Sequence, residues 1–378
     1  MASVKRSDLV WVSEYYNPTG YGEEARGFIS ILDRGLFNLR IMAEFYGRVE
    51  GILTPEQEAQ LALLERAPVD AAKAVVVQHR AAFQFNKEIR GRVNIGRTMF
   101  ETDRIPDDWV LQCGWMDEIW APSRFNIETF NRSGVPLDKL RVVPGGVDVD
   151  AYHPAAPALE LGNRNGYAFL SVFDWTDRKG WDLLLTAYYD EFKPDEDVML
   201  LIKTHRYCTP GSISGEFNHF VKNRIAREQR GFPKVRILEC DMPGPLMPSL
   251  YTACDAFVLP SRGESWGRPY MEAMACGLPV IGTRWGGNLD FMNDENSYLI
   301  EIDGLEDVPG NVLLYAGHQW ARPSVEHLRH LMRYVFEHRQ EARAKGLRAR
   351  EDVCKKWTWE HAASAVIREL AKFNLSDE

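Results

Sequence analysis

The segment with the most informative chemistry runs from Leu259 to Thr283, LPSRGESWGRPYMEAMACGLPVIGT, a pattern of strand end, glycine-rich loop, helix and second strand. Gly263 and Gly267 allow tight turns, and Pro269 suits the first helical turn, where a missing N–H is no loss. The start of such a helix presents unpaired N–H groups and the positive end of the helix dipole, which together favour a bound diphosphate. The backbone amides expected to bind it belong to Ser265, Trp266, Gly267 and Arg268.

Two carboxylates flank this predicted phosphate site. Glu264 precedes the helix, and Glu272 lies in its first turns. Carboxylate oxygens accept hydrogen bonds well from vicinal hydroxyl groups. The pair therefore suits a nucleotide-sugar, with one acid on the sugar and the other on the ribose. The alternative is that Glu272 only complements the helix dipole and Glu264 is a solvated loop charge.

A second candidate is the segment FDWTDRKGWDLLLTAY, Phe173–Tyr188, where a predicted strand ends in a polar turn. The turn carries Arg178 and Lys179, and Gly180 opens an amphipathic helix. Ligands of open α/β sheets bind in the crevice at the carboxyl ends of the strands. Two cations there would neutralise a diphosphate and stabilise the negative charge that grows on a departing nucleotide. A solvated basic turn is the alternative.

The elements that must position these motifs follow an α/β rhythm. Short runs of β-branched and aromatic residues alternate with longer helical patterns, which predicts two doubly wound, Rossmann-like domains. The strands expected in the first half are Leu9–Ser13, Leu39–Ala43, Ala74–Gln78, Val93–Thr98, Glu118–Ala121 and Leu140–Val143. Those expected in the second half are Ala168–Phe173, Val198–Lys203, Val235–Leu238, Ala256–Leu259 and Pro279–Gly282.

A linker is expected at Pro144–Pro154, PGGVDVDAYHP, because its glycines, prolines and aspartates break both helix and strand patterns. It divides the chain into an N-terminal domain of residues 1–150 and a C-terminal domain of residues 151–357. A polar helix is expected over about residues 323–352. The last helical pattern, Trp359–Phe373 within residues 358–374, is expected to fold back on the first domain.

These motifs carry a resemblance to a known family. The run Pro260–Thr283 resembles the donor-site signature of retaining glycosyltransferases of family four, the glycosyl transferases group 1, and Arg178–Gly180 looks like the phosphate-binding turn of that family. PTGYGEEAR at Pro18–Arg26 is similar to its N-terminal glycine loop, and the interdomain segment and the Trp359 helix also match in order. The resemblance implies a GT-B fold, in which two Rossmann-like domains face each other across a cleft.

The resemblance also implies roles for individual residues. Glu264 would contact the donor sugar, Glu272 the ribose, and Lys179 with Arg178 the diphosphate, so Lys179 and Glu264 are expected to be essential for transfer. The family often has an arginine six residues before the lysine, and this chain has Phe173 there. The missing phosphate cation is then expected to be Lys203, at the end of the next strand, or Arg268.

In the first half, Gly20 and Gly22 lie between a strand and a helix, where a backbone without side chains can approach a ligand closely. The resemblance assigns this loop to the donor site. It also assigns His79, at the end of AVVVQH, to the neighbourhood of the reacting centre. The alternative for His79 is a purely structural role.

The sequence after His79 also suggests an acceptor or membrane surface. Residues 79–97 contain several basic side chains and one acid, which suits an anionic acceptor or lipid surface, or else a solvated face. Glu101 and Asp103 are candidate acceptor contacts, or caps of the following helix.

Composition excludes several classes of protein. The formal net charge of -9 argues against non-specific nucleic-acid binding. Six cysteines without a C-x-x-C pair suggest buried thiols in a reducing cytoplasm, and no apolar stretch approaches the ~20 residues that span a bilayer. We expect a cytoplasmic protein, or one that touches the inner face of the membrane peripherally.

Metal and cofactor signals are weak. His327 and His330 lack further ligands at suitable spacing, and the D-x-D of Asp148 and Asp150 lies in the linker rather than beside the donor motif. We therefore expect metal-independent transfer without a cofactor. The acceptor, whether carbohydrate, lipid-linked, protein or small molecule, and the oligomeric state stay open. The alternatives are an epimerase or phosphorylase of the same fold, or a non-catalytic nucleotide-sugar binding module.

Overall fold

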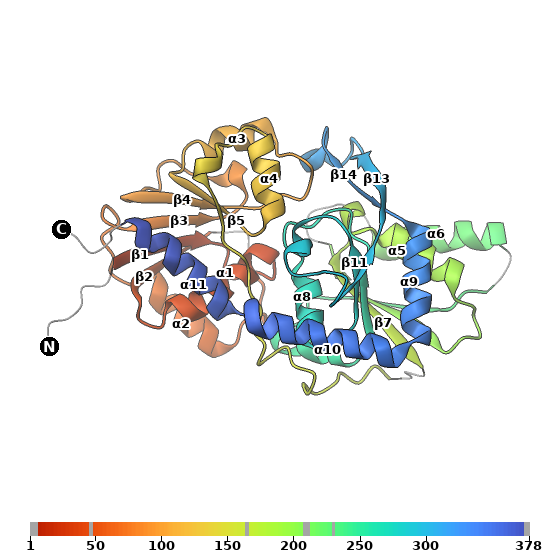
Figure 1. The fold of residues 1–378 in the computed structure, drawn as a ribbon. Coiled ribbons are helices and arrows are strands. Elements are labelled where there is room, and N and C mark those ends of the chain that lie inside the picture. The colour runs from red at the N-terminus through yellow and green to blue at the C-terminus, as the bar shows by residue number, and fades with distance from the viewer. Residues whose placement is uncertain (1–6, 45–47, 163–165, 207–211, 229–230, 374–378) are drawn as a thin grey trace. The chain divides into compact units, whose positions relative to one another are not determined.

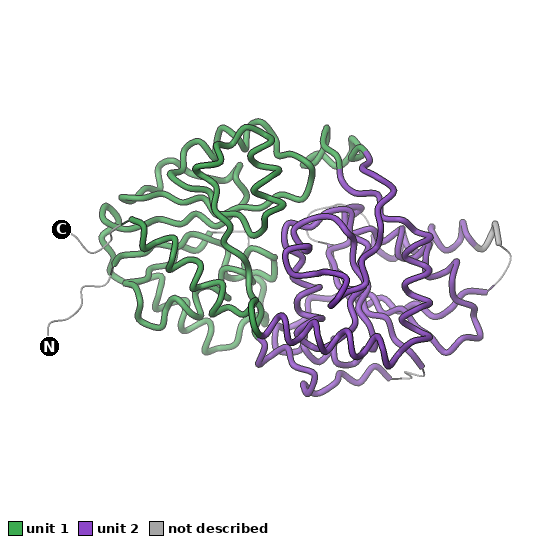
Figure 2. Tube along the Cα trace, viewed as in Figure 1, with its two compact units in different colours: residues 1–148, 307–319, 355–378 green, residues 149–306, 320–354 purple. Residues whose placement is uncertain are grey.

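The computed structural model describes residues 7–44, 48–162, 166–206, 212–228 and 231–373, with only the backbone at 225–228. The chain forms two compact units. Unit 1 comprises residues 1–148, 307–319 and 355–378, and unit 2 comprises residues 149–306 and 320–354 (Figures 1 and 2).

Unit 1 is built on a parallel six-stranded sheet with the order β2-β1-β3-β4-β5-β6. Its strands are β1 (Ser7–Ser13), β2 (Phe37–Ala43), β3 (Val75–His79), β4 (Val93–Arg97), β5 (Glu118–Ala121) and β6 (Leu140–Val142). All six strands expected from the first half of the sequence are present. Every residue of β3 is buried, as expected for a strand covered on both faces.

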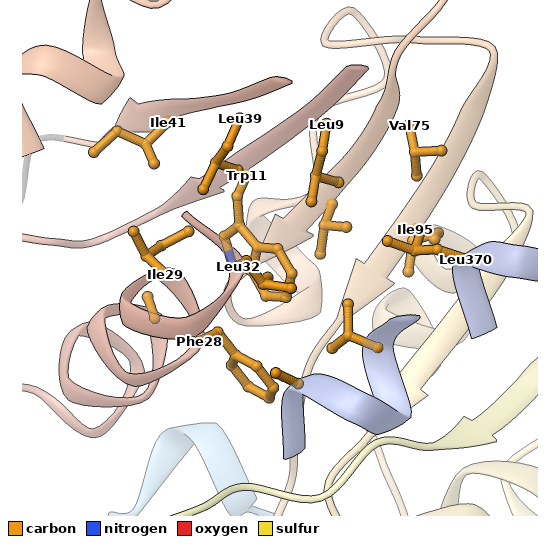
Figure 3. Packing of buried hydrophobic residues seen from close by; sticks show 14 of the residues in the cluster. Leu9, Trp11, Phe28, Ile29, Leu32, Leu39, Ile41, Val75, Ile95 and Leu370 are labelled. Carbon is orange, nitrogen blue, oxygen red and sulfur yellow. The ribbon is translucent and has the colours of Figure 1, made fainter. Parts of the chain in front are cut away.

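The helices of unit 1 cover the two faces of this sheet. They are α1 (Gly20–Leu32), α2 (Pro55–Glu65), α3 (Asp107–Cys113), α4 (Arg124–Arg132) and the C-terminal α11 (Trp359–Leu370). Figure 3 shows a core cluster of unit 1, in which Trp11 of β1 and Phe28 of α1 stack with ring centroids 5.3 Å apart. Ala363 and Leu370 of α11 belong to the same cluster, so the C-terminal helix lies in unit 1.

Unit 2 contains a second parallel sheet with the order β12-β11-β10-β7-β8-β9. Its strands are β7 (Tyr167–Asp174), β8 (Val198–His205), β9 (Lys234–Glu239), β10 (Ala256–Leu259), β11 (Val280–Thr283) and β12 (Tyr298–Ile300). Its helices are α5 (Trp181–Glu191), α6 (Ile213–Glu228), α7 (Met247–Thr252), α8 (Arg268–Ala275), α9 (Val325–Glu337) and α10 (Arg339–Lys356). The predicted α/β class with two doubly wound units is confirmed.

The C-terminal part of the chain differs from the sequence expectation in three ways. The edge strand β12 and the two-stranded sheet of β13 (Ile302–Asp307) and β14 (Gln319–Pro323) were not expected, because β12 has only three residues, β13 is mostly polar and β14 mixes polar and apolar residues. The single helix expected over residues 323–352 is two helices, α9 and α10, which meet at His338. Residues 307–319, expected in the second domain, group with unit 1.

Candidate functional site

The loop and helix of the donor motif form as expected. β10 leads through Pro260–Gly267 into α8, and Gly267 takes the left-handed conformation with φ 85° at the N-cap. Pro269 lies in the first helical turn. The loop is held from the neighbouring strand connection, because the Gly287 N–H donates to the Glu264 carbonyl at 2.7 Å.

Lys179 and Glu264 meet although they are far apart in sequence. Lys179 Nζ lies 2.5 Å from Glu264 Oε1, and Arg178 lies 3.6 Å from the same oxygen. The Arg178 guanidinium also donates to the Gly263 carbonyl at 2.7 Å. Lys179 and Glu264 are both buried. Burial would raise the pKa of Glu264, but the charges of Lys179 and Arg178 outweigh it and hold that pKa below its usual value.

The two motifs are joined through their backbones. Gly180 has φ 67°, and a Cβ there would lie 2.2 Å from the Pro260 carbonyl oxygen. The Arg262 N–H donates to the Arg178 carbonyl at 2.7 Å, and Ser261 Oγ donates to it at 3.2 Å. The turn after β7 and the loop before α8 therefore form one surface with two cations and one acid.

Glu272 is buried and lies beyond the first turn of α8, so it is not the first-turn acid of the dipole alternative. The burial of Glu264 likewise contradicts the alternative of a solvated loop charge. Tyr251 of α7 donates from its hydroxyl to Oε2 at 2.8 Å, and Arg268 donates to Oε1 at 3.0 Å. Sequence reasoning missed Tyr251, because a tyrosine inside the apolar run YTACDAFVL carries no signal beyond core packing.

Lys203 lies at the carboxyl end of β8, beside the strand position where the related arginine is missing. The β7–β8 register pairs Val172 with Lys203, and Phe173 itself is buried against Trp175 with ring centroids 5.9 Å apart. Lys203 Nζ is 3.4 Å from Nδ1 of His205. Burial lowers the pKa of Lys203, and burial with the charges of Lys203 and Lys179 lowers the pKa of His205 to about 4.

The remaining loop residues also point to a polar ligand site. Ser265 is buried, and its hydroxyl has no hydrogen-bond partner within the described part of the chain. Trp266 packs edge-on against Phe291 with ring centroids 5.0 Å apart. The structure thus brings together Lys179, Arg178, Glu264 and the Ser265–Arg268 amides that the sequence singled out.

In unit 1, the glycine loop begins α1 rather than preceding it. Gly20 is exposed, and a Cβ there would have no neighbour within 4 Å in the described part of the chain. Gly22 is buried, and its Cβ would lie 2.7 Å from the Asn17 carbonyl oxygen. Thr19 caps the helix by accepting from the Gly22 N–H at 3.1 Å. Gly20 leaves open backbone for a ligand, whereas Gly22 is required by the fold of the loop itself.

His79 is fully buried inside unit 1. Its Nε2 lies 2.8 Å from Glu24, and its Nδ1 accepts from the Trp11 indole at 3.3 Å. Glu24 also pairs with buried Arg97 at 2.7 Å. Burial lowers the pKa of His79. Because both ring nitrogens have partners, these contacts favour the structural alternative, and a role at the reacting centre stays a prediction.

The basic stretch of residues 79–97 does not form one exposed cationic face. Arg97 is buried against Glu24, and Arg80 is buried and pairs with Glu44. The candidate acceptor contacts are likewise engaged within the chain. Glu101 accepts from the Tyr315 hydroxyl at 2.7 Å, and Asp103 accepts from the Gln319 N–H at 2.7 Å.

Other chemical features are sparse among the residues that the structure describes. No three His, Cys, Asp or Glu side chains gather there as a metal site would require. Of the five cysteines in the described ranges, Cys113, Cys254 and Cys276 are buried, and Cys240 is exposed, contrary to the expectation of buried thiols; Cys208 lies outside these ranges. The described helices include none with the length and apolar character that crossing a bilayer needs.

Two Rossmann-like units, each on a parallel six-stranded sheet, define the GT-B fold of glycosyltransferases. The sucrose-phosphate synthase of Thermosynechococcus elongatus matches with a TM-score of 0.69 and 15% identity, over 98% of this chain and 100% of that one. The Anabaena protein HepE, solved in complex with UDP, matches with a TM-score of 0.68 and 14% identity, over 97% and 100%. At such identities the likeness establishes the fold.

Within this fold, residues 165–309 match the protein family described as Glycosyl transferases group 1. A D-inositol 3-phosphate glycosyltransferase of Corynebacterium jeikeium is 34% identical over 158 residues, 39% of this chain and 36% of that protein. Spore coat protein SA of Bacillus subtilis is 30% identical over 174 residues, 43% and 45% of the two chains. The chain thus spans less than half the length of these relatives. The family match includes both donor motifs.

Proposed function

We propose that the chain is a glycosyltransferase that moves a sugar from a UDP- or GDP-sugar to an acceptor, with retention of configuration and without a metal ion. The observation that carries this proposal is the buried ion pair between Lys179 Nζ and Glu264 Oε1, which lie 2.5 Å apart where the turn after β7 contacts the loop before α8. A nucleotide-sugar needs cations for its diphosphate and acceptors for its hydroxyls at one place. The family match over residues 165–309 supports the same assignment.

The roles follow from the chemistry of each group. Glu264 binds hydroxyls of the donor sugar, and Glu272 binds the ribose hydroxyls. Lys179 and Arg178 neutralise the diphosphate, with the amides of residues 265–268 at the start of α8 as further donors. When the donor binds, phosphate oxygens and sugar hydroxyls replace part of the Lys179–Glu264 interaction.

Lys203 provides the second phosphate cation in place of the arginine absent at Phe173. Its position beside Val172 in the β7–β8 register and its proximity to His205 support this role. His205, with a pKa of about 4, is neutral at pH 7 and adds no competing charge. Arg268 is held by Glu272 and serves mainly to orient that acid.

Catalysis in this proposal rests on leaving-group stabilisation and positioning, and no residue acts as a covalent nucleophile. As the bond between the sugar and the diphosphate breaks, charge grows on the departing phosphate oxygen, where Lys179 and Arg178 stabilise it. The acceptor hydroxyl attacks from the face on which the diphosphate leaves. No cofactor takes part.

The acceptor is a carbohydrate, a lipid-linked sugar, a protein or a small molecule, encountered in the cytoplasm or at the inner face of the membrane. The experiment is a thermal-shift screen with UDP-, GDP-, ADP- and dTDP-sugars, with and without EDTA, since a ligand of the folded state raises the Tm. We expect a base-selective, EDTA-insensitive shift that Glu272→Ala abolishes. No shift with any nucleotide-sugar would contradict the proposal, and a shift without transfer over an acceptor panel would favour a binding module.

A further inference from the structure

Arg262 has an unusual concentration of partners next to the donor turn. Its guanidinium forms two hydrogen bonds of 2.8 Å with the Asp182 carboxylate and donates to the Asp177 carbonyl at 2.6 Å. Its backbone N–H donates to the Arg178 carbonyl at 2.7 Å. Arg262 therefore holds the turn that carries Lys179 through both its side chain and its backbone.

Residues of β13 and β14 contact Arg262 as well. Glu306 accepts from Arg262 Nε at 2.9 Å and from the Trp320 indole at 3.2 Å. The Ala321 N–H donates to the Arg262 carbonyl at 2.9 Å, and the guanidinium lies 5.7 Å from the centroid of the Trp320 ring. Burial would lower the pKa of Arg262, but hydrogen bonds and charges of Asp182 and Glu306 raise it.

The chain between Glu306 and Trp320 is a strap, residues 307–319, that belongs to unit 1. The strap contacts the segment Phe100–Arg104 of unit 1, which we call the seat. The Asp103 N–H donates to the Gln319 carbonyl at 2.9 Å, and His318 Nδ1 lies 2.9 Å from the Arg104 carbonyl. The Tyr315 and His318 rings lie 5.0 Å and 5.7 Å from the Phe100 ring, measured between centroids.

These contacts form a continuous physical connection. It runs from the seat in unit 1 through the strap to Glu306 and Trp320, then through Arg262 to the turn that carries Lys179. The strap is covalently joined to Glu306 and to Trp320, and networks of packed and hydrogen-bonded groups can carry energetic coupling between distant sites. We propose that Arg262 is the positioning residue of the donor turn, and that the strap couples the state of this turn to the Phe100–Arg104 segment of unit 1. This inference rests on the proposed function.

The first test measures the Kd of UDP by calorimetry for the full chain and its variants. We expect Arg262→Gln to weaken UDP binding by about tenfold, since the loss of charge-assisted bonds frees the turn. Arg262→Lys should give an intermediate loss, because lysine keeps the charge but cannot form the two-bond contact with Asp182. Wild type without affinity for UDP or GDP would defeat the proposed function; wild-type affinity retained by Arg262→Gln would defeat only the inference.

Arg333 offers a matched control. It also bonds two carboxylates, Glu191 and Glu196, donates to a backbone carbonyl and lies over aromatic rings, but none of its partners belongs to the donor turn. Arg333→Gln should lower the Tm and leave the Kd of UDP within about twofold of wild type. An equal loss of UDP affinity in both glutamine variants would show that Arg262 is merely structural.

The second test follows hydrogen exchange with and without saturating UDP. In wild type, UDP should slow exchange in residues 302–306 and 320–323 and also in the seat, residues 100–104. The double variant Tyr315→Phe/His318→Ala should keep the first effect and reduce the second, because the strap loses its hydrogen bonds to Glu101 and Arg104 and keeps those between Asp103 and Gln319. A seat that UDP leaves unchanged in wild type, or protects equally in the strap variant, would overturn the coupling.

Discussion

The hydroxyl of Tyr251 donates a 2.8 Å hydrogen bond to Oε2 of Glu272, and both side chains are buried in unit 2. Arg268 holds the other carboxylate oxygen at 3.0 Å. With a partner on each oxygen, the orientation of Glu272 is fixed before any ligand binds. Such pre-orientation by supporting residues is what a binding carboxylate needs for a defined pair of hydroxyl groups.

Tyr251→Phe should therefore weaken UDP binding by about fivefold, corresponding to the ~1 kcal/mol of a typical hydrogen bond. The loss should depend on the ribose. Wild type should bind 2′-deoxy-UDP more weakly than UDP, and this difference should shrink in Tyr251→Phe and vanish in Glu272→Gln. Calorimetric titration of both nucleotides against the three proteins makes the comparison. If the variants lose affinity for UDP and 2′-deoxy-UDP equally, Glu272 does not bind the ribose 2′-hydroxyl.

The sheets of both units could be predicted from the sequence because most of their strands are short apolar runs rich in β-branched and aromatic residues. β5 and β10 have the predicted bounds, Glu118–Ala121 and Ala256–Leu259. β13 could not be predicted, because its sequence IDGLED is polar and contains a glycine. The break between α9 and α10 at His338 could not be predicted either, since the residues on both sides favour helix.

The donor motifs could be located because a glycine-rich turn before a helix has few other uses. Their partners could not be assigned. Lys179 and Glu264 stand 85 residues apart, and only the parallel order β10-β7-β8 brings the ends of their strands together. Arg97 was interpreted as part of a basic face, whereas it is neutralised by Glu24, 73 residues away. Charge partners at such separations depend on topology, which spacing along the chain does not reveal.

Lys179→Met should reduce transfer by at least about 100-fold, because the departing diphosphate loses its main cation. It should also destabilise the fold by about 3 kcal/mol, because Glu264 stays buried without its counter-charge. The double variant Lys179→Met/Glu264→Gln should recover much of that stability and none of the activity. Turnover assays and urea unfolding separate the two effects. Near-normal turnover in Lys179→Met would refute the site.

Gly180→Ala should destabilise unit 2 more than the same change at Gly162. The two glycines have nearly equal backbone angles, φ 67° and φ 68°. A Cβ at Gly162 would have no neighbour within 4 Å among the residues that the structure describes, so only the left-handed conformation costs about 1 kcal/mol. At Gly180 the Cβ would meet the Pro260 carbonyl oxygen at 2.2 Å, which forces the donor turn to move. Equal Tm values for the two variants would show that the turn adapts freely.

Acid should destabilise unit 1 through Glu24. Burial would raise the pKa of Glu24, but Arg97 and His79 lower it from the ordinary 4.5 to about 2. A carboxylate with a lowered pKa stabilises the fold above its unfolded pKa, and this stability is lost as the pH falls toward the folded value. Between pH 4.5 and 2 the contribution is about 3 kcal/mol. The lowered pKa of His79 also makes the folded state less stable as the pH falls, because protonation of this buried ring is unfavourable.

Glu24→Gln isolates this effect from the other acids, such as Glu264, whose pKa is also lowered. The variant should be less stable than wild type at pH 7, because Arg97 stays buried without a counter-charge. The difference in unfolding free energy should narrow as the pH falls from 4.5. Urea unfolding across this range measures it, and a difference that stays constant with pH would contradict the lowered pKa of Glu24.

Lys203→Gln tests whether this lysine replaces the arginine absent at Phe173. The buried ammonium group, whose pKa is lowered by burial, lies 3.4 Å from Nδ1 of His205 at the carboxyl end of β8. If it binds the second phosphate, its loss should weaken UDP by tenfold or more, about 1.4 kcal/mol, and leave uridine almost unaffected. Lys193→Gln, at an exposed lysine of the same unit, should change neither.

The pH dependence of UDP affinity provides an independent test of the same role for Lys203. Because a lowered pKa brings the loss of the Lys203 charge closer to neutrality, UDP affinity in wild type should fall as the pH rises toward the ordinary lysine value of 10.5. Bound diphosphate counteracts this by favouring the charged form, so the nucleotide-free protein should release its proton at lower pH than the complex. In Lys203→Gln this part of the pH profile should flatten. Equal losses for UDP and uridine, with an unchanged profile, would assign Lys203 to the fold and leave Arg178 and Lys179 as the phosphate cations.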